Sequence, residues 1–91
     1  MQSEDNLVSQ GDEADALLKN ETFNSVINNL VEDTFSQFCN SKAGEPSERE
    51  QTYFHYRALV GIVHTLQERV AVRDGIMSKR ESELSDNNGD E

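Results

Sequence analysis

The residues of this 91-residue chain that could support catalysis or metal binding are one cysteine and two histidines. His55 and His64 are nine positions apart, about 13 Å along a helix, so they cannot bind one metal ion within a single helix. Cys39 has no nearby histidine with an orienting acid, which a cysteine nucleophile needs. Its expected role is that of a small buried or half-buried apolar residue. We therefore predict no catalytic residues, no metal site and no cofactor, in a protein that is not an enzyme.

The composition excludes several classes of partner. With 18 acidic and 8 basic side chains, the chain has a formal net charge of -10, which disfavours direct binding to nucleic acid. The longest run without a polar side chain covers only residues 58–63, far short of the ~20 residues of a membrane-spanning helix. The lone cysteine fits a reducing compartment, and residues 1–5 are acidic rather than signal-like. We expect a cytoplasmic protein without a membrane, nucleic-acid or small-molecule partner.

The acidic charge is concentrated in the two flanks of the chain. Residues 1–19 contain five acids and one base, and residues 78–91 contain five acids and two bases. These flanks carry -7 of the total of -10, and their ends have few apolar side chains. We predict a disordered acidic arm over residues 1–12, a helical domain over 13–77 and a disordered acidic tail over 78–91.

A stripe of apolar residues at helical spacing predicts a first helix over residues 21–39. Asn20 stands at the N-cap position, and the segment 40–45 with Gly44 is expected to end the helix. The stripe gives the first half of the predicted hairpin core: Phe23, Val26, Ile27, Leu30, Val31, Phe35 and Phe38.

A second helix is predicted over residues 48–74. Ser47 and Glu50 have the spacing of a capping box, and Asp74-Gly75 predicts the end of the helix, with Gly75 in the left-handed conformation. Apolar residues at alternating steps of three and four give the other half of the core: Tyr56, Leu59, Val63, Leu66 and Val70.

These elements predict an all-α fold, an antiparallel two-helix hairpin, because the connector is only about six residues long. The second helix is longer than the first and extends beyond it, so a short helical turn over residues 13–19 is expected to cover Val70 and its neighbours. A second set of residues on helix 2 lies outside the side that packs on helix 1. This set is the predicted partner interface: Phe54, Ala58, Gly61, Ile62 and Val72. Self-association or docking on a larger assembly would cover this set. A monomer closed by Leu17 and Leu18 remains an alternative.

The order Ala16-Leu17-Leu18-Lys19-Asn20-Glu21-Thr22-Phe23, the second helix through Arg57-Ala58-Leu59 and the close at Asp74-Gly75 resemble a set of small proteins. These are mostly uncharacterised helical-hairpin proteins encoded among the structural genes of tailed bacteriophages. The resemblance covers residues 16–77. It implies a virion or head-assembly accessory protein, found in the host cytoplasm and in the virion.

We accordingly expect a non-enzymatic protein–protein interaction module that acts in phage particle assembly. The alternative is an acidic inhibitor that mimics nucleic acid and blocks a host nuclease, polymerase or repressor. Mimicry requires carboxylates held at fixed positions, whereas most of the excess charge lies on flanks expected to be mobile.

Overall fold

The computed structural model describes residues 3–41 and 46–89, which form three α-helices and, within these ranges, no β-strand. The helices are α1 (Glu4–Leu18), α2 (Glu21–Asn40) and α3 (Pro46–Gly89). The all-α prediction is confirmed. The two-helix hairpin with a short N-terminal turn is corrected to three helices, of which the third is the longest, at 44 residues.

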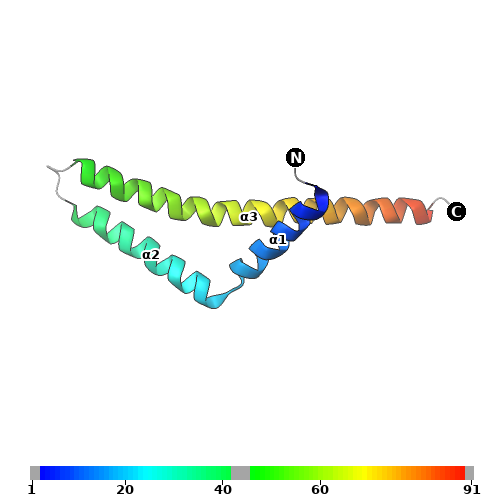
Figure 1. The fold of residues 1–91 in the computed structure, drawn as a ribbon, viewed down its shortest axis with the longest axis horizontal. Coiled ribbons are helices and arrows are strands. Elements are labelled where there is room, and N and C mark those ends of the chain that lie inside the picture. Colours follow the sequence, from blue (N-terminus) through cyan, green and yellow to red (C-terminus); the bar gives the residue numbers. More distant parts are fainter. Residues whose placement is uncertain (1–2, 42–45, 90–91) are drawn as a thin grey trace.

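The molecule is elongated, with extents of 73 × 27 × 20 Å, and α3 runs along its whole length (Figure 1). Helix α2 runs antiparallel to the first half of α3 and diverges from it toward the N-terminal end of α2. The chain then bends between α1 and α2, and α1 returns to cross α3 near the middle of the molecule. Helix α3 is therefore a spine on which α2 and α1 pack one after the other.

Helix α2 begins at a conventional N-cap. The side-chain oxygen of Asn20 accepts a hydrogen bond from the Phe23 backbone N–H at 2.8 Å, as the sequence predicts. At the other end, the Ser41 hydroxyl donates to the Phe38 carbonyl at 2.7 Å. The helix expected over residues 21–39 thus spans Glu21–Asn40, and residues 42–45 of the expected turn lie outside the described residues.

The predicted disordered arm over residues 1–12 is wrong from Glu4 onward, because this segment is the first part of α1. The Ser3 hydroxyl caps the helix by accepting from the Asn6 N–H at 3.2 Å, and Glu4 with Asp5 adds negative charge at the positive end of the helix dipole. The expected turn over 13–19 is the second half of this helix. The side chains of α1 that contact α3 lie on one stripe along the helix. Ala16 and Leu17 are exposed, so they do not cover α3.

The predicted end of helix 2 at Asp74-Gly75 is also wrong. Gly75 has no positive φ and lies inside α3, so it does not form a left-handed C-cap. The helix continues to Gly89 through most of the predicted disordered tail over 78–91, and Arg80 in this stretch pairs with Glu4 and Asp5 of α1. At the N-terminal end of α3, Pro46 is the first helical residue. Ser47 therefore lies inside the first turn and is not the capping residue.

Replacing Gly75 with alanine is expected to stabilise the protein by about 0.5–1 kcal/mol, because alanine is the better helix former. An added Cβ at this position meets no heavy atom within 4 Å. Thermal unfolding followed by circular dichroism measures the change. A loss of stability would instead indicate a left-handed glycine and a helix that ends here.

The side chains of α3 that are shielded from solvent follow a stripe with steps of three, four or seven residues. This spacing is that of a helix packed lengthwise against its neighbours. The stripe passes from the α2 contact to the α1 contact: Arg49, Thr52, Leu59, Val63, Leu66, Val70, Arg73, Ile76 and Arg80.

The packed interior is very small. Among the described residues, the only buried ones are Gly11, Ala14 and Thr52, and Ala14 is the only one with an apolar side chain, 2% exposed. The Thr52 hydroxyl donates to the Glu48 carbonyl at 3.0 Å, which satisfies it within its own helix. Most of the apolar surface of the helices is therefore left half-buried or exposed.

Candidate protein-interaction surface

The candidate site lies on the α2–α3 pair, at the end of the molecule away from α1. One side of this pair carries an aromatic face, which we define as Phe35, Phe38, Tyr53 and Tyr56. With Thr34 and Thr52, these residues line a hollow of about 260 Å³. Phe35 is 62% exposed, and the Arg49 guanidinium lies over the Phe38 ring at 4.8 Å from its centroid.

The other side carries an aliphatic face, which we define as Leu30, Ala58 and Ile62. With Thr34, His55 and Leu59, these residues line a second hollow of about 280 Å³. Ala58 and Ile62 are rotated by roughly 120–160° around α3 from Tyr56, at 3.6 residues per turn. Thr34 lines both hollows because it lies between them on α2.

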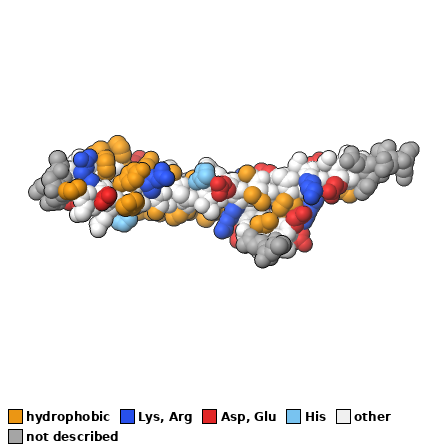
Figure 2. Space-filling view, turned by 90° about the horizontal axis from the view of Figure 1, so that it is seen from above, with side chains coloured by type: hydrophobic (Ala, Val, Ile, Leu, Met, Phe, Trp, Pro, Cys, Tyr) orange, Lys and Arg blue, Asp and Glu red, His pale blue; other side chains and the backbone are white. Residues whose placement is uncertain are grey.

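Hydrophobic side chains gather over this end of the molecule in the space-filling view, and charged side chains gather where α1 crosses α3 (Figure 2). Soluble monomers seldom expose large contiguous apolar patches, and such patches mark interaction sites. The arrangement is therefore suited to binding another protein surface.

The structure brings together only part of the predicted partner interface. Ala58 and Ile62 share the second hollow, and Ile62 is 49% exposed. Phe54 is 61% exposed and lies farther around α3, with its ring centroid 6.0 Å from that of Tyr53. Gly61 faces open space, since an added Cβ would meet nothing within 4 Å.

Val72 is separate from the other predicted interface residues. It is exposed, but it lines a different hollow, beside α1, together with Leu7 and Gln10. The sequence placed Val72 with Phe54 because both lie on the same side of helix 2. The distance along the helix and the position of α1 separate them.

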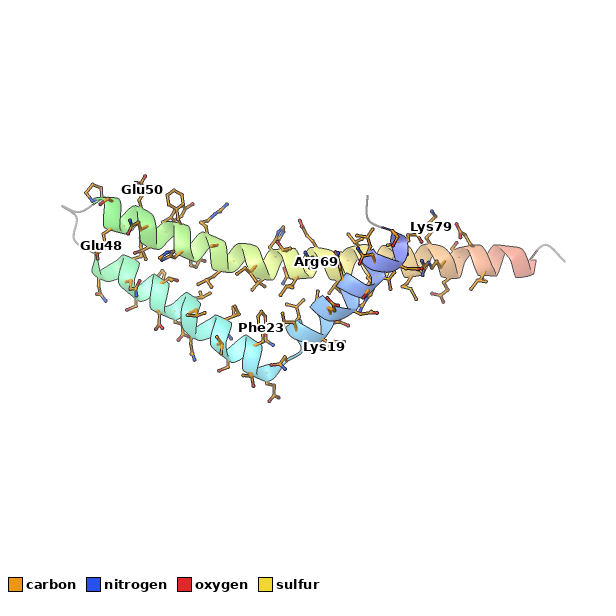
Figure 3. All side chains as sticks on the ribbon, in the orientation of Figure 1. Lys19, Phe23, Glu48, Glu50, Arg69 and Lys79 are labelled. Atoms are coloured by element: carbon orange, nitrogen blue, oxygen red, sulfur yellow. The ribbon has the colours of Figure 1, made fainter. Side chains whose placement is uncertain are left out.

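The predicted hairpin core divides into half-buried and exposed members. The half-buried side chains are Phe23, Ile27, Val31, Phe38, Leu59, Val63, Leu66 and Val70. The exposed ones are Val26, Leu30, Phe35 and Tyr56. Phe23 lies on the side of α2 that faces α3 (Figure 3).

Sequence reasoning missed Tyr53 and assigned Phe35, Leu30 and Tyr56 to the interior. For Leu30 and Phe35, the available signal was the width of the apolar stripe on the first helix, which exceeds what one neighbouring helix can cover. Residues on either edge of that stripe remain accessible on the two sides of the pair.

A second cluster, of charged residues, fixes α1 on the spine. The Nη1 atom of Arg73 donates to Asp12 and to Asp15, each at 3.1 Å, and its Nη2 atom donates to Asp74 at 2.9 Å. Arg73 is shielded, with a side chain only 17% exposed. Arg80 pairs in the same way with Glu4 and Asp5 at 3.1 and 2.9 Å.

These contacts also affect the ionisation of the cluster. Hydrogen bonds from Lys19 and then Arg73 lower the pKa of Asp15 below its ordinary value. Hydrogen bonds to Asp74, Asp15 and Asp12 raise the pKa of Arg73. Both groups are therefore charged at neutral pH, and the cluster acts as a set of ion pairs that positions α1.

The residues first considered for catalysis are not assembled into a site. Within residues 3–41 and 46–89, no group of three or more His, Cys, Asp and Glu side chains is arranged to hold a metal ion. His64 lies 3.5 Å from Glu68 one turn later on the same helix. Cys39 is exposed, so its expected buried or half-buried position is wrong, because the end of α2 has no third helix over it.

Comparisons with protein-family models, with curated proteins and with solved structures found no match to this chain. No described helix is both long enough and apolar enough to span a membrane.

Proposed function

We propose that this chain is a non-enzymatic protein-interaction module that binds its partner through the exposed apolar faces of the α2–α3 pair. The observation that carries the proposal is the pair of hollows lined by apolar side chains on the two sides of two packed helices. Aromatic residues such as Phe35 and Phe54 stand out from this surface. Large exposed apolar side chains of this kind are typical anchors of protein interfaces.

The size of the packed interior supports the same proposal. Ala14 is the one apolar side chain that is buried in the described part of the chain. A chain with so little interior gains little free energy from folding alone. Burial of the aromatic and aliphatic faces on a partner supplies the missing apolar contact.

The alternative, an acidic inhibitor that mimics nucleic acid, has less support. The five carboxylates of the acidic N-terminal segment lie on a helix, which gives them the fixed positions that mimicry requires. However, Arg73 and Arg80 pair with four of these acids: Glu4, Asp5, Asp12 and Asp15. Their charge is thus partly neutralised within the chain itself.

A photo-crosslinking experiment tests the interaction proposal. A benzoyl-phenylalanine side chain is introduced at Tyr53 or Ile62, on the two faces, and at Lys79 as a control in the same helix. Lys79 is exposed and points away from the side on which α2 lies (Figure 3). We expect ultraviolet-dependent protein adducts from the first two positions in the producing cells. Adducts from all three positions in equal amounts, or from none, would contradict the proposal.

The assembly role in a phage particle follows only from the resemblance and stays a prediction. Its test is the presence of the chain, by mass spectrometry, in purified particles from the producing strain. An interaction module without that role would still give the crosslinks described above.

A further inference from the structure

We propose that the partner of the aliphatic face is a second copy of this chain, packed antiparallel to the first about a two-fold axis near Ala58. This inference rests on the proposed function and names its partner. Three features carry it: the exposed area, the shape of the aliphatic face and the distribution of charge.

The exposed area exceeds that of a compact monomer by more than a dimer would bury on each chain. The chain exposes 7048 Å², whereas a compact protein of its mass, 10.3 kDa, exposes about 5,350 Å². Its radius of gyration is 19.7 Å, against about 12 Å for a compact chain of this length. A stable protein interface buries about 800 Å² on each partner. The excess of roughly 1,700 Å² is therefore ample for one such interface.

The aliphatic face has the shape that two-fold packing requires. The short side chain of Ala58 lies in the hollow, and the larger side chains of Leu30 and Ile62, 42% and 49% exposed, stand beside it. Each copy thus offers both a hollow and projecting side chains. A two-fold axis lets a projecting side chain of either copy enter the hollow of the other, which is the self-complementarity of an isologous interface.

The distribution of charge favours an antiparallel second copy. Residues 20–77 carry only -3, whereas the two flanks carry -7. Packing two α2–α3 pairs against each other in opposite directions places their acidic flanks on opposite sides of the axis. Arg73, against which α1 packs, is 15 residues from Ala58, so the two copies of this contact lie roughly 45 Å apart along α3 at 1.5 Å per residue. That separation is far larger than the Debye length of about 10 Å at 0.1 M salt. A parallel pair would place the acidic ends side by side, and a basic partner would bind those ends rather than the aliphatic face.

Sedimentation velocity of the full chain is the first test. We expect the wild type to sediment as a dimer at micromolar concentration. Ile62→Asp should raise the dimer dissociation constant by at least about 30-fold, because a charge replaces a central apolar contact. Val60→Asp, at an exposed residue of α3 that lines neither hollow, is the matched control and should leave the dimer intact. Circular dichroism establishes that both variants remain helical.

Disulfide crosslinking tests the geometry without placing a charge in the interface. In a Cys39→Ser background, Ala58→Cys should give a crosslinked dimer on mild oxidation, because the two-fold axis brings the two copies of this position together. Ser78→Cys, toward the acidic end, should not. Preferential crosslinking through Ser78→Cys would overturn the antiparallel arrangement. Loss of the dimer in Val60→Asp but not in Ile62→Asp would overturn the assigned face.

The outcomes separate this inference from the function on which it rests. A wild type that sediments only as a 10.3 kDa species overturns the second copy as partner. If the photo-crosslinker at Ile62 then captures a different protein, the interaction module stands and its partner is that protein. A monomer that gives no crosslinks overturns both.

Discussion

Replacing Gly11 with alanine is expected to release α1 from α3, although alanine is the better helix former. A Cβ at this position would overlap the Cβ of Arg73 and lie 2.8 Å from the Arg69 carbonyl oxygen. The Arg69 contact is with backbone, which cannot move aside without shifting α3. Overpacking of this kind costs typically 1–3 kcal/mol. We expect hydrogen exchange of the α1 amides to speed up by about 10-fold or more.

Gly75→Ala is the matched control for this prediction. It makes the same chemical change in a helix interior, but its Cβ meets no atom within 4 Å. The two variants share the gain in helix propensity, so the difference between them measures the contact between α1 and α3. Equal stabilisation by both substitutions would show that α1 does not approach α3 at Gly11.

Replacing Arg73 with glutamate is expected to have a still larger effect on α1. The substitution replaces the cation shared by Asp12, Asp15 and Asp74 with a fourth carboxylate. Four like charges at hydrogen-bonding distances repel one another, so we expect the amides of α1 to lose their protection from exchange altogether. Hydrogen exchange followed by mass spectrometry measures this loss helix by helix.

Two further variants show whether the charge itself is responsible. Arg57→Glu makes the same reversal on the exposed surface of α3, where no ion pair to Arg57 is found among the described residues, and should leave α1 protected. Adding Asp12→Arg and Asp15→Arg to the Arg73→Glu chain restores opposite charges across the contact and should restore protection. Failure of this rescue, with α1 still helical, would place the main docking contact elsewhere.

Local chemistry was enough to predict α2. Its apolar spacing and the Asn20 cap involve residues within one or two turns of each other, and both are read directly from the sequence. The same applies to the all-α fold and to the shielded stripe of α3 through Leu59, Val63 and Leu66, because helical periodicity alone brings these side chains to one side.

The exposed interaction surface was only partly predictable. The apolar excess on helix 2 pointed to Ala58 and Ile62, which do lie together. On the first helix, Ile27 and Leu30 belong to one apolar stripe, so the sequence does not separate interior positions from positions at the edge of the stripe. Ile27 is half-buried and Leu30 is exposed, and only the direction from which α3 approaches α2 distinguishes them.

The amino-acid sequence alone establishes the helical class, the α2 element and the apolar character of one side of α3. It does not establish that residues 4–12 are helical or that α3 continues past Gly75, which depend on how the helices pack. The difference lies in the range of the interactions. Arg73 pairs with Asp12 across 61 residues, and Arg80 with Glu4 across 76. These contacts exist only once α1 has folded back onto α3, so they cannot be predicted from a local pattern of acids or glycines.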